Sequence, residues 1–153
     1  TVGSVVTKPG IVTAVVGQCD ITLDQRHLDP NKLATMLREA KEASERFAAE
    51  EKVSVEWNRI WQIEPLPFYP DLIELCDESI LETTDKSHRL PSGPLHDAAE
   101  VARAKVPTIM LFVQSLRGLS HAKEEDTKEE HLLLCVEALD RLATKAMRWV
   151  EDR

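Results

Sequence analysis

The chain has 153 residues, of which 42% are hydrophobic, and carries a formal net charge of −8 at pH 7, which suits one domain or two incomplete ones. Lysine and arginine are scattered among acidic residues, which argues against a nucleic-acid or anionic-membrane partner, and the longest apolar run, IMLFV, is far shorter than the ~20 residues of a membrane span. No secretory signal is visible, and three widely separated cysteines fit reduced thiols better than disulfides, so we expect a soluble, cytoplasmic protein.

The first part of the sequence predicts two strands, a helix and a third strand. Residues 2–16 are rich in β-branched side chains around a proline-glycine turn, and residues 19–29 alternate apolar and polar side chains as a half-buried strand does. Asp29 followed by proline predicts the start of a helix that extends to about residue 50. Its apolar face contains Leu33, Met36, Leu37, Ala40, Phe47 and Ala48. Alternation resumes at 53–61, which indicates an α+β arrangement with the helix covering one face of an antiparallel sheet.

A proline-rich stretch at residues 64–71 divides the chain, and we assign residues 1–66 and 67–153 to two partial domains. Beyond it, a helix is predicted at 71–82, and a short alanine-rich helix at 97–105 leads into an apolar stretch. The inner side of the first of these helices is expected to hold Leu72, Leu75, Cys76, Ser79 and Ile80. The apolar stretch, 106–113, is typical of a strand in a parallel sheet.

A capping box at residues 127–130 predicts the start of a last, amphipathic helix. Its apolar face is expected to contain Leu132, Val136, Leu139, Leu142, Ala146, Met147 and Val150. Helix, helix, strand and helix form part of an α/β fold, but one buried strand is not a sheet. The sequence therefore predicts a domain that lacks part of its own core.

The candidates for chemistry are polar residues near the predicted strand ends: His88, His96, Asp97, Ser120 and His121. Ligands of open α/β sheets bind outside the carboxyl ends of strands, and Ser120 and His121 lie a few residues past such an end. A single loop histidine is more often exposed or structural than a ligand, and Asp97 can equally cap the helix after it. The chain contains no zincin, paired-cysteine, phosphate-loop, dinucleotide or nucleophile-elbow motif.

Two stretches resemble a known family. The first is the upstream stretch VGSVVTKPGIVTAVVGQCDITLDQRHLD, and the second is RLPSGPLHDAAEVARAKVPTIMLFVQSLRGLSH, which is followed four positions later by Glu125. Both are similar, in the same order along the chain, to the C-terminal part of the N-carbamoyl-L-amino-acid hydrolase, allantoate amidohydrolase and β-ureidopropionase family. These enzymes are aminoacylase-like dinuclear metallohydrolases. The resemblance implies part of an α+β small lid or dimerisation domain, then the C-terminal part of an α/β zinc-peptidase-like catalytic domain. It identifies the chain as a fragment of an enzyme that hydrolyses linear C–N bonds of N-carbamoyl-L-amino acids or related ureido or amide substrates.

The resemblance implies roles for five residues. His121 matches the last metal-ligating histidine, and Arg26 matches the arginine that binds the substrate carboxylate with its planar fork. His96 and Asp97 match the segment lining the substrate pocket, and Thr13 stands where the family has a substrate-contacting asparagine. In the intact family, two divalent ions (zinc, manganese, cobalt or nickel) activate a water molecule while the small domain closes over the substrate.

The chain also departs from the family pattern. Thr13 offers a hydroxyl in place of an amide, Leu95 stands at a family glycine, and Val16 stands at a turn proline. No stretch matches the family motifs that carry the other metal ligands and the catalytic glutamate. Because a catalytic zinc usually needs three protein ligands, we expect this chain alone to retain no metal pair and to be inactive.

Two other interpretations stay open. The first is an association module without catalysis, because unpaired sheet edges and apolar faces at residues 20–50 favour a homo-oligomer. The second is a non-catalytic small-molecule binder that uses Arg26 and His96.

Overall fold

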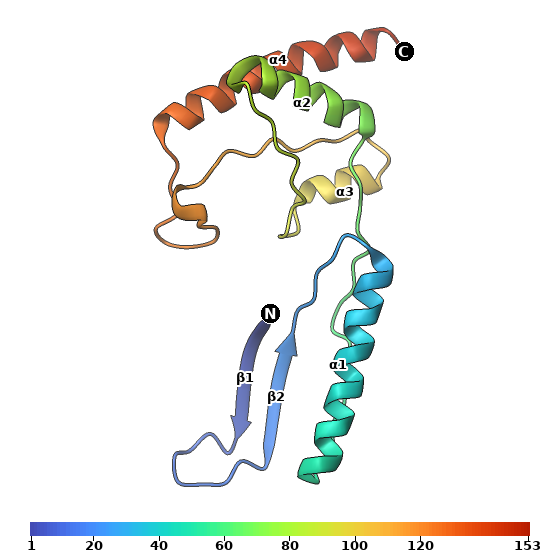
Figure 1. Ribbon diagram of the computed structural model, residues 1–153, viewed down its shortest axis with the longest axis vertical. Coiled ribbons are helices and arrows are strands. Elements are labelled where there is room, and N and C mark those ends of the chain that lie inside the picture. Colours follow the sequence, from blue (N-terminus) through green and yellow to red (C-terminus); the bar gives the residue numbers. More distant parts are fainter. The chain divides into compact units, whose positions relative to one another are not determined.

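The computed structural model describes the whole chain, Thr1–Arg153, and it divides into two compact units, Thr1–Pro65 and Leu66–Arg153 (Figure 1). The first unit contains β1 (Val2–Lys8), β2 (Gln18–Leu23) and α1 (Pro30–Glu51). The second contains α2 (Pro70–Thr84), α3 (Asp97–Arg103), a short 3-10 turn (Leu116–Gly118) and α4 (Glu129–Glu151). No helix combines the length and the apolar character needed to cross a lipid bilayer.

β1 and β2 form an antiparallel hairpin, as predicted, in a two-stranded sheet. Val5 pairs with Ile21 and Lys8 with Gln18, with an irregularity in the register between Val2 and Ser4. The half-burial predicted for residues 19–29 is wrong, because Ile21 is 60% exposed, and Val5 of the partner strand is 58% exposed. The hairpin thus satisfies its inner backbone groups but buries neither face.

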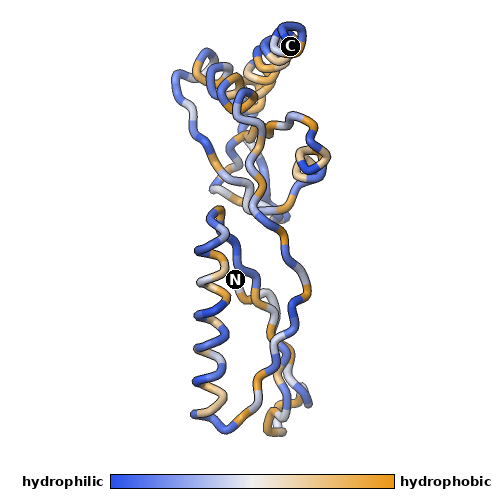
Figure 2. Tube along the Cα trace, turned by 90° about the vertical axis from the view of Figure 1, so that its right-hand side faces the viewer, coloured by the Kyte–Doolittle hydropathy of each residue, from blue (hydrophilic) through white to orange (hydrophobic).

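α1 begins where the sequence predicts. The Asp29 carboxylate accepts hydrogen bonds from the backbone N–H groups of Asn31 (2.8 Å) and Lys32 (3.4 Å), which satisfies two donors that a helix start leaves open. The predicted apolar face is half-buried except for Phe47, which is 54% exposed. Figure 2 shows hydrophilic and hydrophobic residues alternating from turn to turn along this helix.

The predicted third strand at residues 53–61 is not formed. The segment instead lies along α1, where the indole N–H of Trp57 donates to the Ser44 hydroxyl at 2.9 Å and the Lys41 ammonium lies 5.8 Å from the Trp57 ring centre. Residues 53–61 are all exposed, Val53 to 60% and Ile60 to 84%. The alternation of apolar residues therefore does not correspond to a buried side of this segment.

The core of the second unit lies between α2 and α4. The buried side chains are Leu72, Cys76, Ser79, Ala138 and Leu142. The predicted inner side of α2 is confirmed, because Leu75 and Ile80 are also half-buried. The Ser79 hydroxyl donates to the Leu75 carbonyl at 2.7 Å, so its burial leaves no polar group unsatisfied.

The predicted inner face of α4 is wrong except for Leu142 and the half-buried Ala146. The helix packs on α2 through a neighbouring face that contains His131, Cys135, Ala138, Leu142, Lys145 and Trp149. The exposed residues of the predicted face are Leu132 (47%), Val136 (65%), Leu139 (53%), Met147 (62%) and Val150 (63%). Apolar residues occupy more than one side of α4, and the small Ala138 admits the close approach of α2 on the side that packs.

Two further expectations are corrected in this unit. The capping box is not formed: α4 starts at Glu129, Lys128 is its N-cap without a side-chain hydrogen bond, and the N–H of Thr127 bonds to the Asp126 carboxylate at 2.8 Å. Residues 106–113 form no strand, although the Thr108 carbonyl accepts a hydrogen bond from the Tyr69 N–H at 3.2 Å. A parallel strand needs a neighbouring strand on which to pair. The structure is therefore mixed helix with a two-stranded sheet.

Candidate functional site

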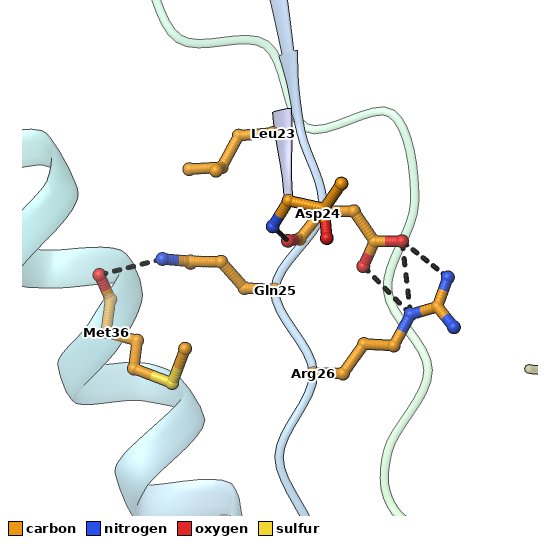
Figure 3. Close-up of a pocket in the computed structure, with 6 residues that line it drawn as sticks. Leu23, Asp24, Gln25, Arg26 and Met36 are labelled. Carbon is orange, nitrogen blue, oxygen red and sulfur yellow. Dashed lines mark hydrogen bonds and ion pairs between the residues drawn. The ribbon is translucent and has the colours of Figure 1, made fainter. Parts of the chain in front are cut away.

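Arg26 forms a tight ion pair at the end of the hairpin. Its Nη2 lies 2.6 Å from Asp24 Oδ2, and its Nε lies 3.2 and 3.1 Å from the two carboxylate oxygens (Figure 3). Hydrogen bonding to the guanidinium lowers the pKa of the Asp24 carboxyl below its ordinary value, and the pKa of Arg26 is raised by the same pair. Both side chains therefore stay charged at neutral pH.

The backbone around this pair is anchored on two sides. The Asp24 N–H donates to the Thr1 carbonyl at 2.9 Å, and the Thr1 nitrogen donates to the Asp24 carbonyl at 2.8 Å. Gln25 lies on the opposite side of the chain from the ion pair and donates to the Met36 carbonyl of α1 at 3.1 Å (Figure 3). A hollow of about 340 Å³ is lined by Thr1, Leu23, Asp24, Gln25, Arg26 and Met36.

Thr13, the other predicted substrate contact of the first unit, lies in the turn between β1 and β2 and is exposed. It does not line the hollow that contains Arg26.

His96 and Asp97 lie at the start of α3, with both side chains exposed. His96 is the N-cap residue but makes no side-chain cap. Asp97 is the first residue of the helix, so the alternative role of Asp97 as a cap is not observed. The imidazole of His96 packs edge-on against Phe112, with ring centres 6.2 Å apart.

Arg89 fastens the loop that leads to His96 onto α2. Its Nη2 lies 2.7 Å from Glu74 Oε2 and 2.8 Å from Asp77 Oδ2, and Ser87 also donates to Asp77. The hydrogen bonds from Ser87 and Arg89 lower the pKa of Asp77. The loop thus starts from a fixed point on the helix.

His121 lies in a closed loop and has an exposed side chain. Its backbone is left-handed (φ 55°), and its N–H donates to Glu125 Oε2 at 2.7 Å. Its Nδ1 lies 3.3 Å from the Ser120 hydroxyl oxygen. The Leu116 N–H donates to the Asp126 carbonyl at 2.7 Å and closes the loop. An exposed imidazole with one nitrogen oriented by a neighbour is suited to act as a single ligand.

The donor set of this chain does not fit a metal pair. Nowhere do three or more histidine, cysteine, aspartate or glutamate side chains come together as a metal site. Within the second unit, no hydrogen bond or ion pair joins His121 to His96 or Asp97. His121 is suited to supply one ligand and no more.

Sequence reasoning did not find the contacts that fix these side chains. Asp24 is signalled by its spacing of two residues from Arg26 in an extended segment, which places both on one side. Glu125 carries no comparable local signal, because its role depends on the left-handed turn at His121. A second hollow, lined by Lys128, Glu129, Glu130 and Leu133, contains none of the candidate residues.

Comparison with known proteins identifies the class. The model of peptidase family M20/M25/M40 matches residues 2–145, so the chain belongs to this family. It is 27% identical to the allantoate amidohydrolase of Bacillus subtilis, over 95% of this chain and 35% of the relative. It is 30% identical to the allantoate amidohydrolase of Escherichia coli, over 83% of this chain and 31% of the relative. It is 26% identical to the N-carbamoyl-L-amino-acid amidohydrolase of Paenarthrobacter aurescens, over 92% of this chain and 36% of the relative. The chain spans about a third of the length of these curated relatives. No solved structure gives a significant match.

Proposed function

We propose that this chain supplies the lid residues and the C-terminal catalytic-domain residues of a metal-dependent amidohydrolase. The observation that carries the proposal is the family match over residues 2–145, together with relatives named as allantoate and N-carbamoyl-amino-acid amidohydrolases. The fragment resembles about a third of each relative, so we assign the remaining ligands and the catalytic base to residues outside these 153.

The proposed substrate is a small molecule with a carboxylate and a ureido or amide group, as in the named substrates of the relatives. Arg26 binds the carboxylate, since a planar guanidinium matches it with two parallel hydrogen bonds. His96, Asp97 and Thr13 contribute to the pocket. Because Thr13 has a shorter side chain than asparagine and only a hydroxyl, we expect the preferred substrate to differ from that of relatives with an amide there.

In this proposal His121 would hold one of two divalent ions, and these ions would supply activation of a water molecule for attack on the carbonyl carbon, so that the C–N bond breaks with nitrogen as the leaving group. The residues of this chain bind and orient the substrate. Immobilising the reacting group is itself a large part of such catalysis.

A chimera tests the proposal. The corresponding region of the Bacillus subtilis allantoate amidohydrolase is replaced by this chain, and hydrolysis of allantoate and N-carbamoyl-L-alanine is measured with added Mn²⁺. We expect turnover that His121→Ala reduces at least about a hundredfold, since loss of a metal ligand removes activation of the water. The isolated chain is expected to give none. A folded chimera whose turnover is unaffected by His121→Ala contradicts the metal role, and turnover by the isolated chain contradicts its incompleteness.

A second candidate is an association module. The observation that favours it is the exposed apolar side of α4 described above. A chain that stays monomeric would contradict this candidate, whereas the chimera tests the first.

A further inference from the structure

We propose that Asp77 of α2 is a positioning residue that holds the loop of residues 85–96, and with it His96, in one place relative to α2. The inference rests on the proposed function of His96 as a residue of the substrate pocket. It starts from the side chain of Asp77, which is only 23% exposed and accepts hydrogen bonds from two residues of the loop. Figure 1 shows this loop running from the end of α2 to α3.

The two carboxylate oxygens of Asp77 bind different parts of the loop. Oδ1 accepts from the Ser87 hydroxyl, and Oδ2 accepts from Nε and Nη2 of Arg89 at 3.1 and 2.8 Å. The same Nη2 donates to Oε2 of Glu74 at 2.7 Å, and Glu74 lies on the same side of α2 because it is three residues from Asp77. An isolated, exposed ion pair stabilises little. Here one largely covered carboxylate joins two loop residues to the helix, so the loop is attached at two points.

The chain between this attachment and His96 has few ways to move. Pro91 and Pro94 each fix one backbone dihedral, and the Ser92 hydroxyl donates to the Pro94 carbonyl at 2.6 Å. At the far end, the His96 imidazole packs edge-on against Phe112, with ring centres 6.2 Å apart. Because the connection is short and restrained, movement of the loop at its attachment to α2 is passed on to His96.

A purely structural role for Asp77 is the opposing interpretation. The carboxylate would then only stabilise the second unit, and its loss would have no specific effect on His96. If Asp77 acts through His96, the effect of its removal on substrate binding disappears once the His96 side chain is gone. A double-mutant cycle therefore separates the two interpretations, because only the second one couples the two residues.

The first measurement is NMR of the 153-residue chain without ligand. For Asp77→Ala we expect the amide order parameters of residues 90–96 to fall from about 0.85 to below about 0.6. The ring-current shift that Phe112 causes at the His96 imidazole should shrink, while the amides of α2 and α4 keep their order parameters. Asp77→Asn retains the shape and an acceptor oxygen and should give a smaller change of the same sign.

Glu78→Ala is the matched control. Glu78 is the next carboxylate along α2, but it pairs with Lys145 of α4 at 3.1 Å and not with the loop. We expect this variant to leave the order parameters of the loop and the His96 shifts unchanged. The inference fails if Asp77→Ala leaves the loop as ordered as before, or if Glu78→Ala loosens it equally.

The second measurement uses the chimera described above. We expect Asp77→Ala to raise the KM for N-carbamoyl-L-alanine roughly three- to tenfold, the scale of ordering one side chain on binding, with little change in kcat. In the His96→Ala background, Asp77→Ala should change KM no further. Equal effects of Asp77→Ala in the two backgrounds would assign it a structural role and overturn the inference. A chimera without turnover, or one whose KM is unaffected by His96→Ala, would contradict the proposed function, while the order parameters would still decide whether Asp77 holds His96.

Discussion

At the scale of single residues, the loop that carries His121 depends on one side chain. A left-handed backbone at a residue with a side chain costs roughly 1–2 kcal/mol, and here the cost is offset by the hydrogen bond from the His121 N–H to Glu125 Oε2. The acceptor is a carboxylate, which forms stronger hydrogen bonds than a neutral group. Glu125 thus stabilises the backbone that presents the imidazole.

We predict that Glu125→Ala releases this turn. The His121 N–H should exchange with solvent roughly tenfold faster, and φ measured from NMR couplings should move from positive to negative values. Glu125→Gln keeps an acceptor oxygen and should preserve the turn in part. Glu124→Ala is the control, because that neighbouring side chain forms no hydrogen bond or ion pair in the structure. A positive φ in Glu125→Ala would show that the loop is held by other contacts.

At the scale of elements, features that depend on neighbouring residues in the sequence were predicted well, whereas pairing between distant segments was not. The start of α1 follows from Asp29 and a proline, both within one turn of the helix. The strands expected at 53–61 and 106–113 depend on neighbours that no local pattern specifies, and neither is formed. The packed face of α4 was missed because its apolar residues occupy more than one side, so periodicity alone does not choose the side that meets α2.

The same limit applies to the candidate site. The family motifs located Arg26 and His121 in the sequence, and the structure places them at the end of β2 and in the loop before α4. Their roles remain part of the proposal. The partners Asp24 and Glu125 depend on backbone conformation, so the structure was needed to find them.

The packing of α2 on α4 gives a prediction at this scale. Ala138 is 3% exposed on the buried side of α4. Ala138→Leu should overfill that contact and lower the free energy of unfolding by about 1–3 kcal/mol, measured by chemical denaturation with circular dichroism. Ala143→Leu adds the same atoms to an exposed position of the same helix. At a concentration at which the chain is monomeric, this variant should change stability little. Equal effects of the two variants would contradict the packing described for α4.

At the scale of the whole molecule, α4 bears an apolar stripe that is exposed except at Ala146, which is half-buried. It consists of Leu132, Val136, Leu139, Ala143, Ala146 and Val150. The successive spacings of four and three residues are those of the a and d positions of a coiled coil, which form a continuous seam along a helix. Association that removes this exposed apolar surface from water is favourable, so the stripe favours binding to a covering surface. Either a second copy of the chain or a further part of the proposed amidohydrolase would serve as the covering surface.

We predict that the isolated chain self-associates through this stripe. Its mass from sedimentation equilibrium should rise with concentration, and Leu139→Glu should shift the equilibrium towards the monomer, because it places a charge in the apolar seam. Arg148→Gln changes the net charge by the same amount on another side of α4, and it should leave association unchanged. A monomeric unmodified chain across the whole concentration range would exclude self-association, and it would leave the amidohydrolase proposal to be decided by the chimera. Association that Leu139→Glu leaves intact would move the interface to another surface, with the open edges of the hairpin as the next to test.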